Sequence, residues 1–337
     1  MNILLTSAGR RTYLVNYFKD ALKSYGGKVF ASNSVDTYSL KQADGYTITP
    51  PIYSDGYINH LIEFCLSNNI KAVISLFDID LPVLSKNIST FKKYGIEVIV
   101  SNESVIDICN DKWKTYQFLL ANNINTPTTY LSLNSLYSDM ENIKFPLIVK
   151  PRWGMGSIGV YKADNIDELN VFYKKVVNEI KSTYLKHESA SNIEQSVIMQ
   201  QYISGAEYGI EVINDLQKKY ITTMCKKKIS MRSGETDLAI TLKEPRLETI
   251  GKQLSHKLGH IGLLDTDCLE QNGVFYILEM NARFGGQYPF SHLAGANLPL
   301  QIIEWLLGNK TEKKNISIKY NVLSSKDIQP VIVENGN

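Results

Sequence analysis

The first hundred residues alternate between short apolar runs and amphipathic segments, and this alternation narrows the folds open to the chain. Asn2–Ser7 has the pattern of a strand buried on both faces, and Arg11–Lys23 carries apolar side chains at helical spacing. The rhythm predicts a doubly wound α/β unit, in which helices cover both faces of a parallel sheet. Its other elements are expected at Lys28–Ser32, Tyr57–Asn68, Ala72–Leu76, Leu81–Tyr94 and Glu97–Val100.

Polar residues follow two of these strands. Gly9 and Arg10 come after the first strand, and Asp78 comes after Ala72–Leu76. Because ligands of open α/β sheets bind at the carboxyl ends of the strands, Arg10, its neighbour Arg11 and Asp78 are candidates for lining the substrate pocket. A turn or helix-cap role explains Gly9 and Asp78 equally well.

The second half of the chain has an α+β pattern, with antiparallel strands and interposed helices. A helical stretch is expected at Ser101–Asn123 and stops before Pro127. The strand Phe145–Lys150 ends in a lysine, and Gly154, Gly156 and Gly159 follow it in the spacing G-x-G-x-x-G.

These glycines do not form a dinucleotide fingerprint, because the fingerprint must open a helix and this segment leads into a β run at Gly159–Lys162. A glycine-rich connection between strands is typical of a flap whose backbone N–H groups cover nucleotide phosphates, with Lys150 as a nearby cation. A flexible surface hairpin is the alternative.

An apolar strand at Val197–Glu207 is interrupted at Ser204-Gly205. A strand that leaves its sheet exposes main-chain groups that can hydrogen-bond an adenine edge, and Glu207 could accept hydrogen bonds from ribose. A structural hinge with a charged rim would have the same pattern.

The run Ile277–Gly286 (ILEMNARFGG) joins an apolar strand to a set of polar side chains. Glu279 and Asn281 offer the hard oxygens that Mg²⁺ prefers, and Arg283 offers donors suited to a phosphate. A preceding strand at Leu264–Glu270 would bring Asp267 onto the same face, provided that the hairpin loop has three residues. A two-residue turn would turn Asp267 away, and solvated strand-end carboxylates are the alternative to a metal site.

Composition excludes several classes of protein. The net charge of +2 and the scattered basic residues, with one cluster at Lys226–Lys228, do not suggest nucleic-acid binding. No apolar run approaches the ~20 residues of a membrane helix, and the start lacks the charge order of a signal peptide, so a cytoplasmic protein is expected. His256 and His260 lack the HExxH pattern and are expected to form a surface pair on a helix.

Taken in order, the motifs resemble those of the ATP-grasp enzymes, in particular the branch that contains the large chain of carbamoyl-phosphate synthase. The resemblance covers roughly residues 1–308 and rests on Asp111-Lys112, Val149–Pro151 with its flap, Gln200–Glu207, and Asp267 with Glu279–Arg283. It implies a pre-ATP-grasp domain over 1–108, an ATP-grasp domain over 109–309 with a glycine-flap lid at about 125–200, and a tail over 310–337.

The resemblance also implies roles. Arg283 and Lys150 would be catalytic, and Asp267, Glu279 and Asn281 would hold one or two Mg²⁺ ions, with Mn²⁺ as an alternative. Gln200 stands where relatives often have an acidic residue, and Asn281-Ala282-Arg283 replaces Asn-Pro-Arg. The implied ATP-binding residues are Lys112, Lys150, Gly154, Gly156, Ser157, Gly159, Gln200, Gln201, Tyr202, Ile203 and Glu207.

A polar loop at Met231–Asp237 resembles the family's acceptor loop, which faces the acyl phosphate. Arg232 is expected to contact a substrate carboxylate, because a guanidinium pairs bidentately with that group. Gly234, Glu235 and Thr236 are further candidates for substrate binding, and an exposed hairpin turn is the alternative.

The expected function is therefore an ATP- and Mg²⁺-dependent ligase that joins a carboxylate to an amine through an acyl phosphate. The alternatives are an enzyme that forms carboxyphosphate or a carbamoyl product from bicarbonate, and a nucleotide-binding regulator without turnover. Small-molecule substrates and a possible homodimer are expected as partners, with no nucleic acid or membrane.

Overall fold

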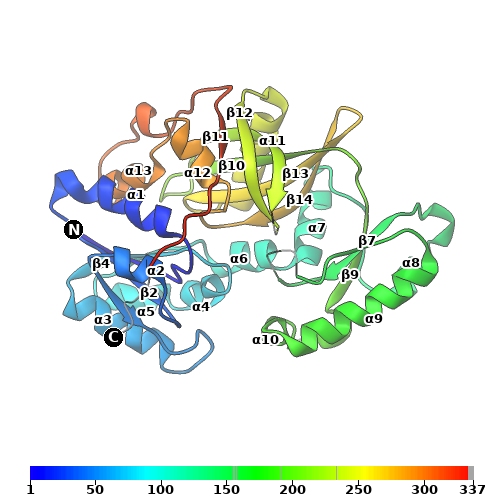
Figure 1. Cartoon of the computed structure of the whole chain (residues 1–337), viewed down its shortest axis with the longest axis horizontal. Helices are drawn as coiled ribbons and strands as arrows, with labels where there is room; N and C mark the ends of the chain where they lie inside the picture. Colours follow the sequence, from blue (N-terminus) through cyan, green and yellow to red (C-terminus); the bar gives the residue numbers. More distant parts are fainter. Residues whose placement is uncertain (155, 157, 191, 233, 333–337) are drawn as a thin grey trace.

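The computed structural model describes residues 1–332 except positions 155, 157, 191 and 233. Figure 1 shows three parts: a parallel sheet near the N-terminus, an antiparallel sheet above it, and a small sheet with one long helix that extends to the side. None of the described helices combines the length and apolarity needed to cross a bilayer.

The first sheet is parallel, with the order β3-β2-β1-β4-β5, as the alternating pattern predicts. The chain moves outward from β1 in one direction and then returns to the other side of it, so the crevice lies at the carboxyl ends of β1 and β4. The strands are β1 (Asn2–Thr6), β2 (Val29–Asn33), β3 (Gly45–Ile48), β4 (Ile70–Ser75) and β5 (Glu97–Ile99).

The helices of this part differ in places from the sequence-based prediction. The single helix expected at Leu81–Tyr94 is two helices, because Asn87 leaves the helical conformation between them. Both α2 and β3 were absent from the prediction, and β3 is a half-exposed edge strand. The helices are α1 (Thr12–Leu22), α2 (Tyr38–Gln42), α3 (Tyr57–Ser67), α4 (Asp80–Lys86) and α5 (Ile88–Lys93).

Two further helices, α6 (Glu103–Asn110) and α7 (Lys112–Ala121), replace the continuous helix expected at Ser101–Asn123. The break is at Asp111, which has an extended backbone and caps α7 by accepting hydrogen bonds from the N–H groups of Trp113 and Lys114. Lys112 therefore occupies the first turn of α7.

The second sheet is antiparallel, with the order β14-β13-β10-β11-β12-β15. The tail supplies β15 as an edge strand, and α11 packs on β10 and β11. His260 lies beyond the end of α11 and is fully buried, so the expected surface pair with His256 is wrong. The elements are β10 (Ala206–Asn214), β11 (Tyr220–Arg232), β12 (Glu235–Leu242), β13 (Leu263–Gln271), β14 (Val274–Asn281), β15 (Leu323–Ser325), α11 (Pro245–Leu258), α12 (Tyr288–Leu293) and α13 (Leu298–Leu306).

The third sheet, order β6-β9-β7-β8, and its helices form a unit that we call the lid. Leu147, Val149, Leu169 and Val176 belong to a hydrophobic cluster confined to the lid, whereas two other clusters join the first and second sheets. A short helix, α10, follows the long helix α9. The lid elements are β6 (Thr129–Tyr130), β7 (Leu147–Pro151), β8 (Tyr161–Ala163), β9 (Val197–Gln201), α8 (Leu133–Tyr137), α9 (Ile166–Ser182) and α10 (Leu185–Glu188).

Candidate active site

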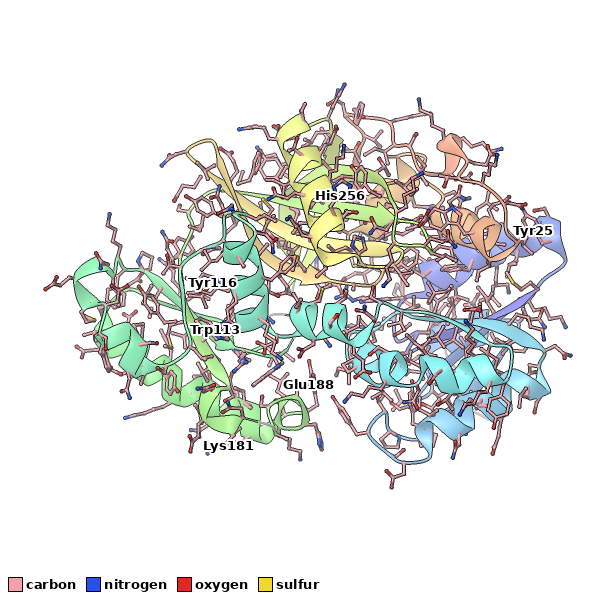
Figure 2. The ribbon with its side chains drawn as sticks, turned by 180° about the vertical axis from the view of Figure 1, so that it is seen from behind. Tyr25, Trp113, Tyr116, Lys181, Glu188 and His256 are labelled. Carbon is pink, nitrogen blue, oxygen red and sulfur yellow. The ribbon has the colours of Figure 1, made fainter. Side chains whose placement is uncertain are left out.

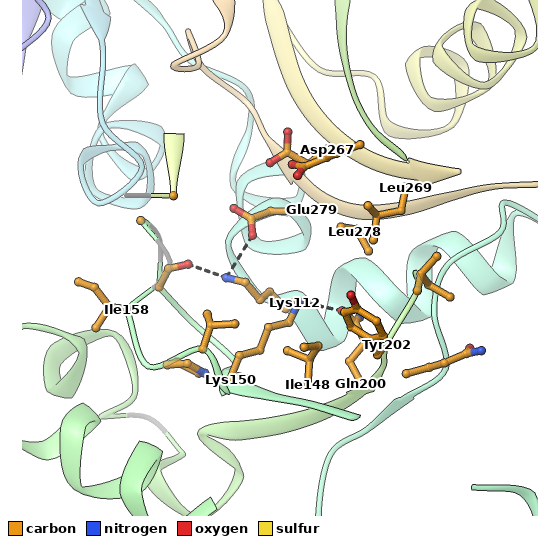
Figure 3. Close-up of a pocket in the computed structure, with 18 of the residues that line it drawn as sticks. Lys112, Ile148, Lys150, Ile158, Gln200, Tyr202, Asp267, Leu269, Leu278 and Glu279 are labelled. Carbon is orange, nitrogen blue, oxygen red and sulfur yellow. Dashed lines mark hydrogen bonds and ion pairs between the residues drawn. The ribbon is translucent and has the colours of Figure 1, made fainter. Parts of the chain in front are cut away.

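A cavity of about 450 Å³ lies between the lid and the second sheet, and we call it the first cavity. Figure 3 shows Lys112 and Lys150 side by side at its floor, with Glu279 and Asp267 above them. The Nζ atom of Lys112 donates to the carbonyl of Gly154 at 2.5 Å and lies 3.7 Å from a carboxylate oxygen of Glu279. Two cations and two carboxylates from distant parts of the chain thus meet at one end of the cavity.

An ion pair that sequence reasoning missed joins α7 to the start of the flap. The guanidinium of Arg152 donates to both carboxylate oxygens of Asp111 at 2.7 Å, and both side chains are buried. The N–H of Lys112 also donates to the carbonyl of Arg152 at 3.2 Å. These bonds fix the first turn of α7, and with it Lys112, against the lid.

Lys150 has a neutral partner. Its Nζ donates to Oε1 of Gln200 at 2.8 Å, and the Gln200 amide in turn donates to Thr129 at 2.9 Å. Burial and the neighbouring charge of Lys112 lower the pKa of Lys150 to about 8, although Glu279 partly opposes them. The ammonium is therefore poorly compensated in this structure and suited to an incoming anion.

The three glycines of the flap all adopt positive φ, at 132°, 66° and 68° for Gly154, Gly156 and Gly159. Gly154 and Gly156 line the first cavity, whereas Gly159 packs near Pro151 and Glu179. The segment continues into β8 and not into a helix, which agrees with the rejection of a dinucleotide fingerprint. Ser157 lies outside the described residues.

The other end of the cavity has apolar walls and free backbone. Gln200, Gln201, Tyr202, Ile203 and Glu207 all line it, where the chain leaves β9. The N–H groups of Gln201 and Tyr202 already donate to lid carbonyls, whereas the N–H of Ile203 has no main-chain partner within the described ranges. Main-chain recognition of a base is therefore best placed at Ile203.

Lys228 is a site residue that sequence reasoning missed. Its buried Nζ donates to Glu207 at 2.7 Å and to Asp267 at 2.6 Å, and so joins β11 to the adjacent strand β10 and to β13 beyond it. Lys226 points to the same face and forms a fully buried pair with Glu211 at 2.7 Å. The sequence signal for both residues was their spacing: in a strand, Lys226 and Lys228 share one face and Lys227 points to the other.

The register of the β13–β14 hairpin differs from the prediction. The turn has two residues, Asn272 and Gly273, both with positive φ, and Gln271 pairs with Val274. The three-residue loop, on which the placement of Asp267 beside Glu279 depended in the sequence analysis, is therefore not present.

A β-bulge brings Asp267 next to Glu279 in spite of the two-residue turn. The register shifts between Cys268 and Asp267, so that Leu278 is unpaired and Asp267 lies opposite Glu279. Leu278 and Glu279 consequently both line the first cavity, as Figure 3 shows. The extra residue cancels the change of face that the short turn would otherwise impose on Asp267.

Arg283 is held by two carboxylates. Its Nε and Nη2 atoms donate to one oxygen of Asp78 at 2.9 and 2.6 Å, and Nη1 lies 3.2 Å from Asp265. Asp265, opposite Asn281 in the hairpin, was not predicted. The structure thus places Asp78 next to Arg283, at the crevice of the first sheet.

A second cavity of about 230 Å³ adjoins the first and shares Gly156, Gly234, Asp267 and Glu279 with it. Glu235, Thr236 and Arg283 also line it. The structure does not bring two predicted substrate residues to its wall: Arg10 is exposed, and Arg232 pairs with Asp237 at 3.1 Å on the hairpin surface. Arg11, which the sequence predicts together with Arg10, does line the cavity.

Comparison with known proteins places these features in a family. Residues 3–99 match the family model described as "PylC-like, N-terminal domain", and residues 109–287 match the model described as "ATP-grasp domain". The chain belongs to the ATP-grasp family. The α/β fold class and the resemblance inferred from the sequence are thereby confirmed.

Curated relatives and solved structures agree with this assignment. The chain is 25% identical over 234 residues to the carbamoyl phosphate synthase large chain of Thermoanaerobacter sp., which covers 66% of this chain and 20% of the relative. It is 20% identical over 328 residues to the arginine-specific large chain of Bacillus subtilis, covering 91% and 30%. This ATP-grasp chain therefore spans less than a third of the length of either relative.

The fold resembles that of a biotin carboxylase from Campylobacter jejuni, with a TM-score of 0.75, 19% identity, and coverage of 96% of this chain and 74% of the other. It also resembles an L-amino acid ligase from Bacillus licheniformis, with a TM-score of 0.73, 20% identity, and coverage of 95% and 78%.

Proposed function

We propose that this ATP-grasp protein is a ligase that activates a carboxylate as an acyl phosphate and joins it to an amine, with release of ADP and phosphate. The observation that carries the proposal is the junction of the two cavities, where Lys112, Glu279 and Asp267 adjoin Arg283. One cavity has the form of a nucleotide site and the other that of a site for an organic acid. We further propose the domain limits 1–108, 109–309 and 310–337.

The first cavity would hold ATP with its base near Ile203, its ribose near Glu207, and its phosphates near the two lysines. The apolar side chains of Ile148, Leu269 and Leu278 supply walls for an adenine ring. Lys112, Lys150 and the flap backbone would offset the phosphate charge, and a closed flap would exclude water from the acyl phosphate.

The carboxylates fit a divalent cation. Asp267 lies opposite Glu279, and Asn281 follows two residues later on the same strand, so that hard oxygens converge. Burial opposes ionisation of Glu279, but the charges of Lys112 and Lys150 outweigh it and hold the pKa of this carboxyl below its usual range. These three residues would hold Mg²⁺, which supplies further positive charge to the phosphates when bound.

The second cavity would bind the carboxylate substrate. Arg11 and Arg283 both contribute to its wall and offer guanidinium groups for an anion. Asp78 and Asp265 fix the orientation of Arg283, so that little side-chain entropy remains to be lost when the phosphoryl group is transferred.

Bicarbonate activation is the second candidate, because one structural neighbour, a 2-oxoglutarate carboxylase domain from Hydrogenobacter thermophilus, was solved in complex with bicarbonate. The second cavity has a volume of about 230 Å³, several times the ~30 Å³ that one water molecule occupies in the liquid. This size favours an acid larger than bicarbonate.

The test is release of ADP and phosphate with Mg²⁺-ATP in pools of carboxylates with amino acids, amino sugars or bicarbonate, for the parent and for Glu279→Gln. Release that requires both a carboxylate and an amine, and is lost in the variant, supports the ligase. Release with bicarbonate alone supports carboxyphosphate formation. ATP binding without cleavage in any pool supports a regulator.

A further inference from the structure

A small hollow of about 20 Å³ lies where the two cavities meet the first sheet. It shares Lys112, Gly154 and Glu279 with the first cavity, and Asp78, Glu279 and Asn281 with the second. A group the size of one water molecule needs a cavity of roughly 10–15 Å³. The hollow therefore has room for a single small head group.

A further cavity of about 370 Å³, which we call the outer cleft, lies beside the hollow. The two share Asn110 and Glu188 in their linings. Figure 2 shows Glu188 on the short lid helix, pointing toward the helices of the first part of the chain. Glu188 and Asn110 therefore stand at the boundary between the outer cleft and the hollow.

Two acceptor side chains of the hollow, Asp78 and Glu188, keep oxygens without a donor among the described residues, although the side chain of Lys112 also belongs to the lining. Asp78 is 4% exposed, its Oδ2 binds Arg283, and its buried Oδ1 has no hydrogen-bond partner within the described ranges. Glu188 likewise has no hydrogen bond or ion pair among the described residues, and Asn110 uses its amide nitrogen to bind the carbonyl of Asp78 at 3.3 Å. An unpaired buried oxygen costs free energy, so the hollow favours a ligand that donates several hydrogen bonds.

The outer cleft is also suited to a cation. Its wall carries Glu103, Asp107 and Glu188 against Lys86, but Asp107 is paired with Lys114 at 2.6 Å, so Glu103 and Glu188 supply the uncompensated negative charge. The indole of Trp153 adds an aromatic surface, with the Arg152 guanidinium 4.3 Å from its ring centre.

We propose that the hollow is an ammonium subsite, in which Asp78 Oδ1, Asn110 and Glu188 receive the amine substrate after it enters through the outer cleft. This inference rests on the proposed ligase function and names the charge of the acceptor and its route. The amine approaches from one side of Glu279 and Asn281, and the carboxylate lies in the second cavity on the other side.

Glu188 also has a chemical role in this arrangement. Burial raises its pKa to about 7, which suits a group that accepts a proton near neutral pH. The ammonium loses one proton to the Glu188 carboxylate, and the free lone pair attacks the acyl carbon. The C–N bond forms, the C–O bond to phosphorus breaks with its electrons on the phosphate, and the second amine proton passes to that phosphate.

The kinetic test compares the parent with Glu188→Gln, using a carboxylate and amine pair that supports ADP release in the pools described above. Acyl phosphate formation is measured separately by trapping with hydroxylamine, a neutral nucleophile that needs no ammonium subsite. We expect unchanged hydroxamate formation and a KM for the amine that rises about tenfold or more, the usual effect of losing a hydrogen bond to a charged group. Glu194→Gln is the control, since Glu194 is an exposed lid residue on none of these walls.

An unchanged KM for the amine would overturn the proposal. A loss of hydroxamate formation as large as the loss of ligation with the amine would also overturn it, because Glu188 would then act in the ATP or carboxylate step. Absence of hydroxamate from the parent with every carboxylate would refute the ligase function instead. A binding measurement tests the subsite without turnover: saturation-transfer NMR with butylammonium and butanol. We expect butylammonium to bind the parent and to weaken about tenfold in Glu188→Gln, and equal binding to both proteins would overturn the subsite.

Discussion

Lys150 shows how one side chain can set the charge of the proposed phosphate site. Its partner Gln200 is neutral, and burial with Lys112 nearby lowers the pKa of Lys150 to about 8. Above that pH the free protein holds a neutral amine that must gain a proton to bind phosphate. We expect the Kd for ATP to rise about tenfold between pH 7 and pH 9.

Gln200→Glu tests this explanation, because a carboxylate beside the ammonium favours its charged form and raises the pKa of Lys150. The increase in Kd should then begin at higher pH, as measured by calorimetric titration of ATP across this range. Superimposable pH profiles for the two proteins would show that Lys150 does not control binding.

A second prediction at the scale of the residue concerns Lys228. Lys228→Met removes the shared cation of Glu207 and Asp267 and leaves two partly buried carboxylates facing each other. We expect the free energy of unfolding to fall by about 2 kcal/mol, less than the ~3–5 kcal/mol for breaking a fully buried pair, because both carboxylates keep some solvent contact. Urea denaturation measures the change.

Lys227→Met is the matched control, since Lys227 is exposed on the opposite face of the same strand. Its effect should stay within about 0.5 kcal/mol. Equal losses in the two variants would contradict a special role for the Lys228 bridge.

Among the elements, the flap is held in shape by its glycines. Gly156 and Gly159 have nearly the same positive φ, but a Cβ at Gly159 would lie 3.2 Å from Pro151 and 3.1 Å from Glu179, whereas a Cβ at Gly156 meets nothing within 4 Å. Both alanine variants should lose about 1 kcal/mol to backbone strain, and Gly159→Ala should lose more. Hydrogen exchange of β7 and β8 checks the order, and greater exchange in Gly156→Ala would contradict it.

At the same scale, local patterns predicted most elements but not their interruptions. Periodicity identified every strand of the first sheet except the edge strand β3, yet Asn87 and Asp111 each end a helix inside an unbroken apolar pattern. The bulge at Leu278 could not be predicted from the alternation of apolar and polar residues. It adds one unpaired residue to β14, and nothing in the residue types marks that position. Contacts such as that of Asp78 with Arg283, 205 positions apart, follow only from how the sheets are placed together.

Stability of the whole molecule should depend on a buried histidine far from the candidate site. His260 is fully buried and binds the carbonyl of Val212 at 3.1 Å, and burial lowers its pKa to about 4. The unfolded chain takes up this proton below about pH 6.5 but the folded chain only near pH 4, so stability is lost as the pH falls through this window. Between pH 7.5 and 5.5 the loss should be about 1.3 kcal/mol.

The measurement is urea denaturation at both pH values for the parent, for His260→Asn and for His187→Asn, which changes an exposed histidine. The free energy of unfolding should differ less between the two pH values in His260→Asn than in the parent, by about 1.3 kcal/mol, and this change should not occur in His187→Asn. An unchanged difference in that variant would assign the pH dependence to other groups.

The lid has a hydrophobic core of its own, whereas two hydrophobic clusters join the first and second sheets. The lid also supplies Lys150 and the chain from Gln200 to Ile203 to the first cavity, while the described walls of the second cavity, apart from Gly156, come from outside it. The proposed acid site therefore belongs almost entirely to one part of the chain, whereas the proposed nucleotide site is divided between the lid and the second sheet. A lid transplanted from a relative that uses another nucleotide should alter nucleotide binding in part and leave the acid that is activated the same.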